Sequence, residues 1–232
     1  MTAFRSTIQQ QGRRTAERIV APLARLGVTP NGLTLFGLLL NVLAALLLAW
    51  QVYIPGGLMV LVGGAFDMLD GALARVSNRK TVFGGFFDST IDRYSEAVVF
   101  LGLQVAFLRD AMAGAQTGAG GEWYAWTGVV LCYVVAINSL LISYTRARAE
   151  VDGLDCEVGW LQRPERVIIL GLGLLLPRPG PLVVLALLAL LTQVTVLQRI
   201  LHVRRLTAER EAGGGESAGR RAGRPAGRDG KG

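Results

Sequence analysis

The chain has 232 residues, of which 51% are hydrophobic and 18% are charged; its mean hydropathy is +0.42 and its formal net charge is +7. Apolar runs such as LTLFGLLLNVLAALLLAW do not fit a water-soluble domain, because about 20 apolar residues match the roughly 30 Å hydrocarbon core of a bilayer. Composition therefore excludes a soluble globular domain and predicts an all-α integral membrane protein.

Six segments are predicted to cross the membrane as helices. In chain order they cover residues 33–53, 55–75, 82–108, 123–147, 165–177 and 180–202. The fifth segment is short, and the polar stretch RARAEVDGLDCEVGWLQRPER separates it from the fourth. Residues 31–206 are therefore expected to form one six-helix membrane domain.

The segments outside this domain have different compositions. Residues 1–30 are expected to form an amphipathic helix in the cytoplasmic interface and a turn, because apolar side chains such as Phe4 and Ile8 share one helical face among arginines. A solvated basic leader is the alternative. Residues 207–232 contain few apolar side chains, which predicts a disordered basic tail. A solvated tail is favoured over one that binds acidic lipid or RNA, and nucleic acid is not an expected partner.

Arginine and lysine are distributed unevenly between the connecting segments. They precede the first span and recur near residues 75–80, 146–166 and 199–205, whereas the opposite ends of the spans carry only Arg109 and Arg178. The positive-inside rule then places both termini and the aspartate-bearing ends in the cytoplasm. Without a recognisable cleavable signal peptide, we expect a multi-pass protein of the cell membrane.

Four aspartates in FDMLDGALARVSNRKTVFGGFFDSTIDRY lie within or against segments that are otherwise suited to lipid. Asp67 and Asp70 are three residues apart near the end of the second span, and Asp88 and Asp92 are four apart near the start of the third. Residues at these spacings share a helical face, so two adjacent helices can direct four carboxylates at one point. Each unneutralised carboxylate would cost roughly 3 kcal/mol at mid-membrane. A positive partner is therefore expected.

Hard divalent cations are the partner that this donor set favours. Carboxylate oxygens suit Mg²⁺ or Mn²⁺, and two such ions can stabilise the attacking and leaving oxygens in phosphoryl transfer. The pattern predicts a two-metal phosphoryl-transfer site at the cytoplasmic membrane surface. A structural ion-pair cluster with Arg75 and Arg93 is a weaker interpretation. A divalent-cation transporter is the alternative from another class, although spans four to six show no matching polar pathway.

The spacing D-x2-D-G-x2-A-R-x8-G-x3-D-x3-D resembles the signature of the CDP-alcohol phosphatidyltransferases. Its positions are filled, in order, by Asp67, Asp70, Gly71, Ala74, Arg75, Gly84, Asp88 and Asp92. The resemblance implies that the four aspartates bind the metals, that Asp92 also acts as general base, and that the protein is a homodimer. It further implies that CDP-diacylglycerol is bound by Pro30, Asn31, Gly32, Leu33, Thr34, Gly71, Ala74, Arg75, Thr81 and Gly84.

A second pair of motifs bears on the acceptor alcohol. SYTRARAE followed by RPERVIIL resembles the branch of this family that uses inositol phosphate to make phosphatidylinositol phosphate or its archaeal-lipid counterpart. The resemblance makes Arg146, Arg163 and Arg166 the candidates for the acceptor phosphate, to which guanidinium groups donate paired hydrogen bonds. Trp160 and Gln162 depart from the pattern expected there. Glycerol 3-phosphate, which would yield phosphatidylglycerol phosphate, is the alternative acceptor.

Overall fold

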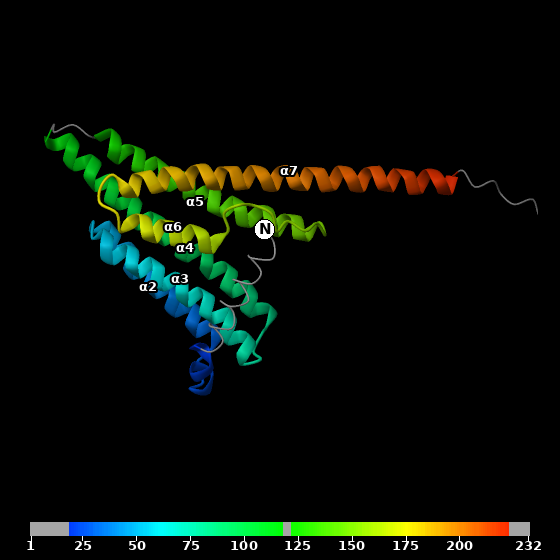
Figure 1. Cartoon of the computed structure of the whole chain (residues 1–232), viewed down its shortest axis with the longest axis horizontal. Helices are drawn as coiled ribbons and strands as arrows, with labels where there is room; N and C mark the ends of the chain where they lie inside the picture. Colours follow the sequence, from blue (N-terminus) through cyan, green and yellow to red (C-terminus); the bar gives the residue numbers. More distant parts are fainter. Residues whose placement is uncertain (1–18, 118–121, 223–232) are drawn as a thin grey trace, which may run out of the picture.

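The structure, a computed structural model, describes residues 19–117 and 122–222, and these contain helices and no strands. Residues 19–25 are helical, but the rest of the predicted interfacial helix lies outside the described residues. The helices that follow are labelled in Figure 1: α2 Pro30–Ala49, α3 Tyr53–Val76, α4 Val82–Thr117, α5 Glu122–Val151, α6 Arg163–Leu174 and α7 Gly180–Ala222. The all-α prediction is confirmed.

The start of α2 corrects one expectation. The first span was predicted to start at residue 33 after a turn, but residues 30–34, which are predicted to bind CDP-diacylglycerol, already form the first turn of the helix. Thr29 caps this end, because its Oγ1 accepts a hydrogen bond of 3.2 Å from the backbone N–H of Gly32. Pro30 fits the first turn since it has no N–H to satisfy and its φ is already helical. At the other end Gln51, with φ 64°, lies in the connection to α3, so α2 ends before the predicted boundary at residue 53.

Within residues 19–117 and 122–222, five helical segments are long and apolar enough to cross a membrane. They are α2, α3, residues 82–116 of α4, α5 and residues 180–211 of α7. With 20 residues, α2 spans about 30 Å, the thickness of the hydrocarbon core. Large apolar side chains such as Leu35, Leu46 and Leu190 point outward, as expected where lipid covers the surface. The protein is a multi-pass membrane protein. α6, with 12 residues, is too short to count as a span by length.

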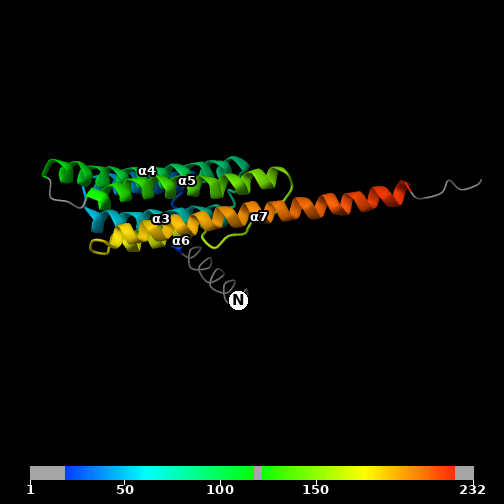
Figure 2. The ribbon, with the colours of Figure 1, turned by 90° about the horizontal axis from the view of Figure 1, so that it is seen from above.

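The helices close into a ring. The closely packed pairs are α2 with α3, α3 with α6, α6 with α7, α7 with α5, α5 with α4, and α4 with α2. Figure 2 shows α4 and α5 along one side of the bundle and α3, α6 and α7 along the other. Their buried faces share one core that includes Leu48, Val60, Phe107 and Leu185. Because α4 and α6 sit across this ring from each other, they meet through side chains rather than through closely packed backbones.

The last helix is longer than expected. α7 continues past Leu206, where the sequence predicts the membrane domain to end, and runs as one helix to Ala222 beyond the other helices (Figure 1). Arg205 and Glu209 are one turn apart and form an ion pair of 2.8 Å on its exposed surface. Such pairs, together with the alanine, arginine and glutamate of this segment, favour helix. Residues 223–232 lie outside the described residues.

Candidate active site

The four predicted metal-binding aspartates come from the consecutive helices α3 and α4, near the connection between them, and α2 packs against both helices. Asp70 is buried on α3, and its Oδ2 accepts a hydrogen bond of 2.7 Å from Thr34 Oγ1 of α2. Asp70 also interacts electrostatically with Asp88 of α4. α2 can approach because Gly37 has no side chain: a Cβ there would lie 2.7 Å from Asp67 Oδ1. Three helices therefore surround the carboxylates.

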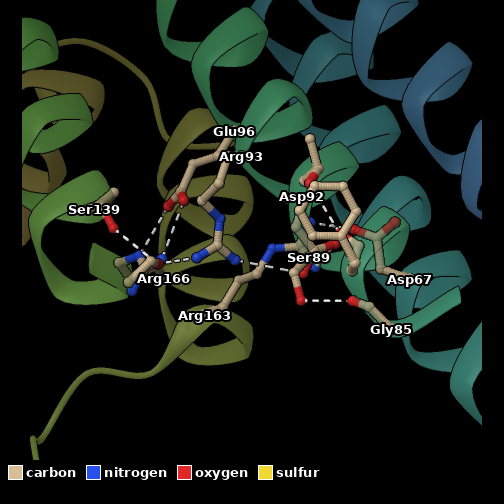
Figure 3. Close-up of polar contacts among 12 residues, drawn as sticks. Asp67, Gly85, Ser89, Asp92, Arg93, Glu96, Ser139, Arg163 and Arg166 are labelled. Atoms are coloured by element: carbon tan, nitrogen blue, oxygen red, sulfur yellow. Dashed lines mark hydrogen bonds and ion pairs between the residues drawn. The ribbon is translucent and has the colours of Figure 1, made fainter. Parts of the chain in front are cut away.

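Arg163, at the start of α6, lies between two of these carboxylates. Its Nη2 is 2.7 Å from Asp67 Oδ2 and its Nη1 is 2.7 Å from Asp92 Oδ1 (Figure 3). The Arg163 side chain is 19% exposed, whereas Asp67 and Asp92 are 5% and 14% exposed. One guanidinium thus neutralises part of a cluster that the sequence analysis expects to need cations.

A second ion pair lies one helical turn further along α4. Glu96 accepts two hydrogen bonds from Arg166 of α6, 2.8 Å from Nε to Oε1 and 3.1 Å from Nη2 to Oε2. Beside it, Arg93 contacts Asp92 at 3.4 Å and hydrogen-bonds to Ser143 Oγ of α5. Figure 3 shows the arginines of α4 and α6 interleaved with these acids. The site is therefore a continuous network of alternating charges.

The residues predicted to bind CDP-diacylglycerol form the adjoining wall. Thr81 caps α4, since its Oγ1 accepts a hydrogen bond of 2.9 Å from the N–H of Gly84. A Cβ at Gly84 would lie 3.6 Å from Asn31 Oδ1, so the starts of α2 and α4 lie close together. The Arg75 side chain runs back along α3 beside Gly71, where a Cβ would lie 3.6 Å from Arg75 Nη1, an ordinary contact distance. Ala74 lies in the same last turn of α3, and Leu33 is buried among its apolar neighbours.

The three arginines predicted to bind the acceptor phosphate do not all converge. Arg163 and Arg166 face the carboxylate network, as described above. Arg146 lies on the exposed end of α5, where its Nε is 2.8 Å from Glu150 and its Nη2 is 2.7 Å from Glu157. This side chain is 45% exposed and is held by acids outside the network. The structure thus separates Arg146 from the other two.

The segment before α6 is attached to α7. Arg199, which is 5% exposed, donates a hydrogen bond of 3.0 Å from Nε to the carbonyl of Val158, and a further bond to the carbonyl of Ile142. Gln198 Oε1 accepts a bond of 3.3 Å from the N–H of Trp160. These contacts hold the chain that enters α6, and therefore help to place Arg163.

A small cavity lies behind the arginines. It is lined by Asp67, Ser95, Glu96, Arg163 and Arg166 together with Asn41 and apolar side chains of α3, α4 and α6, and its volume is about 20 Å³. That volume suits one water molecule and excludes a sugar phosphate. An acceptor would have to bind on the open side of the arginines.

The carboxylates fit a hard divalent cation in chemistry. All four are oxygen donors, and the buried Asp67 Oδ1 has no hydrogen-bond partner among the described residues. Within the same part of the chain, no three acidic, histidine or cysteine side chains are grouped closely enough to enclose an ion. The contacts of Arg163 explain the difference, because this guanidinium engages oxygens of Asp67 and Asp92 that a metal would use.

Two residues of the candidate site, Glu96 and Arg199, were not predicted from the sequence. Glu96 had a readable signal, since it continues the i, i+4 series of Asp88 and Asp92 on α4. Arg199 had none that separated it from the arginines expected at the cytoplasmic end of a span. Only the fold shows that it turns inward to bind backbone carbonyls.

Comparison with known proteins gives the same class. Residues 27–207 match the family described as CDP-alcohol phosphatidyltransferase. The archaetidylinositol phosphate synthase of Pyrococcus horikoshii is 34% identical over 201 residues, which cover 86% of this chain and 96% of that protein. The phosphatidylinositol phosphate synthase of Mycobacteroides abscessus is 38% identical over 205 residues, covering 83% and 86%.

Solved structures are similar as well. The phosphatidylinositol phosphate synthase of Mycobacterium tuberculosis with CDP-DAG bound superposes with a TM-score of 0.68 and 33% identity, over 82% of this chain and 94% of that chain. The same enzyme in complex with manganese and citrate gives 0.67 and 32%, over 81% and 88%.

A helical membrane bundle with carboxylates and arginines gathered between α3, α4 and α6 is the framework of a membrane-embedded phosphotransferase. The chain belongs to the CDP-alcohol phosphatidyltransferase family and is an enzyme of that class. Its relatives include phosphatidylinositol phosphate and archaetidylinositol phosphate synthases, which act in phospholipid synthesis.

Proposed function

We propose that this enzyme transfers a phosphatidyl group from CDP-diacylglycerol to a hydroxyl of inositol 1-phosphate and releases CMP. The observation that carries the choice of a phosphorylated acceptor is the position of Arg163 and Arg166, and the inositol phosphate synthases among the relatives favour inositol 1-phosphate over glycerol 3-phosphate. Two cationic side chains of α6 stand directly beside the carboxylates of α3 and α4. A phosphorylated acceptor needs such donors, whereas an uncharged alcohol does not.

In the proposed reaction the acceptor hydroxyl attacks the phosphorus that bears the diacylglycerol. A new phosphorus–oxygen bond forms, the bond from that phosphorus to the bridging oxygen of the pyrophosphate breaks, and CMP leaves with this oxygen. Asp92 takes the proton of the hydroxyl as general base, which requires hydrogen-bond reach between the two oxygens. Asp92 suits this role because it contacts both Arg93, at 3.4 Å, and Arg163, at 2.7 Å, and so lies on the side of the cluster where the acceptor is proposed to bind.

Asp67, Asp70, Asp88 and Asp92 are the side chains that would hold Mg²⁺ or Mn²⁺, with two ions expected. When bound, such ions neutralise the pyrophosphate and the leaving CMP. The related enzyme in complex with manganese supports this assignment. The start of α2, the end of α3 and the capped start of α4 would bind the cytidine diphosphate, as proposed for Asn31, Gly71, Ala74, Arg75, Thr81 and Gly84. Their closeness in the fold supports a single nucleotide site.

The same proposal includes the setting of the enzyme. We place the six-helix domain of residues 31–206 in the cell membrane with α6 as the sixth crossing, an interfacial helix before it and a basic tail after it. The excess of arginine near the site supports a cytoplasmic active site and cytoplasmic termini. A homodimer is part of the proposal through the family resemblance alone.

CMP release tests the proposal directly. The purified protein in detergent would receive CDP-diacylglycerol and Mg²⁺ or Mn²⁺, with inositol 1-phosphate, inositol, glycerol 3-phosphate or serine offered separately. We expect release with inositol 1-phosphate, loss of release in Asp92→Asn, and retention in Asp110→Asn at the far end of the same helix.

Each outcome has a defined meaning. Release with glycerol 3-phosphate alone would keep the reaction and change the acceptor. Release with free inositol at equal efficiency would contradict the role of Arg163 and Arg166. If folded and metal-bound protein released no CMP with any acceptor, the divalent-cation transporter would be favoured.

A further inference from the structure

The ion pair between Glu96 and Arg166 is among the most deeply buried charged contacts of the network. Their side chains are 9% and 3% exposed, and two hydrogen bonds join one edge of the guanidinium to both carboxylate oxygens. This arrangement engages Nε and Nη2 of Arg166. The Nη1 group is not part of the pair.

The pair joins two helices that do not pack closely. α4 and α6 lie on different sides of the helical ring. Two ion pairs join them near the carboxylates, Asp92 with Arg163 and Glu96 with Arg166. The spacings agree, because four residues on α4 rise about 6 Å and three residues on α6 about 4.5 Å. The two helices therefore hold a defined register through their charged side chains.

The two ion pairs engage different carboxylates. Arg163 engages Asp67 and Asp92, which the proposed reaction needs for metal binding and proton transfer. Arg166 engages Glu96, to which the proposed reaction assigns no role. The Glu96–Arg166 pair can therefore stay intact while the contacts of Arg163 break to admit metal and substrate.

Burying an ion pair is an inefficient way to stabilise a fold, because the cost of removing both charges from water offsets much of their attraction. A paired guanidinium with a fixed orientation is instead suited to recognition of an anion. Losing Glu96 would leave Arg166 without its acidic partner and one turn away from Asp92 and Asp67, two carboxylates that share the single guanidinium of Arg163, and Arg166 would be drawn toward them.

We infer that Glu96 is a positioning residue for the acceptor: it holds Arg166 by one edge, away from the catalytic carboxylates, so that the remaining edge receives the acceptor's phosphate. This inference rests on the proposed function. It assigns to Glu96 an effect on the phosphorylated acceptor and none on CDP-diacylglycerol.

The test is a comparison of Michaelis constants for the two substrates in Glu96→Gln, measured by CMP release with full-length protein. We expect the KM for inositol 1-phosphate to rise about tenfold or more, the change that corresponds to one misplaced charge-assisted contact. The KM for CDP-diacylglycerol should stay within about twofold of wild type, given that sites without shared partners act independently. Glu96→Asp, which keeps the charge on a shorter side chain, should recover part of the loss.

Two control variants separate positioning from stability. Leu103→Ala opens a fully buried site on the same helix, and Asp110→Asn breaks the ion pair of Asp110 with Arg178 at the other end of α4. Both should lower the melting temperature and leave the KM for inositol 1-phosphate unchanged. If Leu103→Ala raised this KM as much as Glu96→Gln at an equal loss of stability, Glu96 would have a structural role only.

The remaining outcomes are also decisive. Should Glu96→Gln fail to fold, Glu96→Asp replaces it, and this variant should show a smaller but equally selective rise in the KM for inositol 1-phosphate. An unchanged KM in Glu96→Gln, with a raised KM in Arg166→Gln, would overturn the inference and spare the proposed function. If Arg166→Gln also left acceptor use unchanged, the proposed acceptor site itself would be refuted.

Discussion

Replacing Arg163 by glutamine should make the enzyme bind Mn²⁺ more tightly while it loses activity. Arg163 contacts Asp67 Oδ2 and Asp92 Oδ1 at 2.7 Å each, and these oxygens belong to two of the proposed metal ligands. A guanidinium and a divalent ion cannot both use them. Metal binding to the wild-type protein therefore includes the work of displacing this side chain.

The size of the effect follows from these two contacts. A hydrogen bond between charged groups contributes about 1.5–3 kcal/mol, and releasing at least one of them is required. Because about 1.4 kcal/mol corresponds to a factor of ten, Arg163→Gln should lower the dissociation constant for Mn²⁺ by about 10- to 100-fold. The partial burial of all three side chains keeps the discount for solvent screening small.

Calorimetric titration of detergent-purified protein with MnCl₂ measures this constant without substrate. Arg178→Gln is the matched control, since Arg178 pairs with Asp110 far from the site and its removal should leave Mn²⁺ binding unchanged. In EDTA, Arg163→Gln should melt below wild type, because four carboxylates then lack their cation. An equal or weaker affinity for Mn²⁺ in Arg163→Gln would refute competition between the arginine and the metal.

Three further predictions concern packing and a buried thiol. Gly37→Ala should reduce CMP release about tenfold or more with little change in expression, because its Cβ would displace the Asp67 carboxylate, which lies 2.7 Å away. Gly102→Ala should lower the free energy of unfolding by about 1–3 kcal/mol, measured as a lower melting temperature, since its Cβ would overlap the backbone of Ala45 and force α4 from α2. Burial raises the pKa of the Cys156 thiol, so less thiolate forms at pH 8 and iodoacetamide should label it more slowly than in the SDS-unfolded chain, as followed by mass spectrometry. The folded protein binds the thiol proton of Cys156 more tightly than the unfolded chain does. This contribution to the free energy of unfolding is therefore lost as the pH rises above the ordinary thiol pKa. Equal labelling rates in the folded and unfolded chain would contradict the prediction for Cys156. A wild-type melting temperature in Gly102→Ala would contradict the prediction for that variant.

Much of the bundle was predictable because membrane helices can be recognised from their local composition. The predicted spans agree with α3, α4 and α5 to within a few residues at their starts, and the start of α7 agrees as well. The misjudged boundaries have local causes. Thr29 and Pro30 begin α2 earlier than its apolar run suggests, and the charged helix formers beyond Leu206 continue α7 after the apolar run has ended.

The candidate site divides in the same way. Asp67, Asp70, Asp88 and Asp92 could be assigned to one site from the sequence alone, because an i, i+3 or i, i+4 spacing defines a helical face and a short loop joins the two helices at the ends that carry these residues. The arginines could not be assigned in this way. Their partners are many residues distant along the chain, and positive charge near a span is expected for orientation alone.

The sequence by itself determined the class of fold, the membrane setting and the carboxylate cluster, since each depends on periodicity or on spacing within one or two adjacent helices. Only the tertiary structure decided that Arg163 bridges Asp67 and Asp92, that Arg166 belongs to Glu96, and that Arg146 turns away to Glu150 and Glu157. The physical reason is the closure of the ring, which brings α6 opposite α4 and so lets Arg163 and Arg166 reach acids that lie about 70 residues or more away in the sequence.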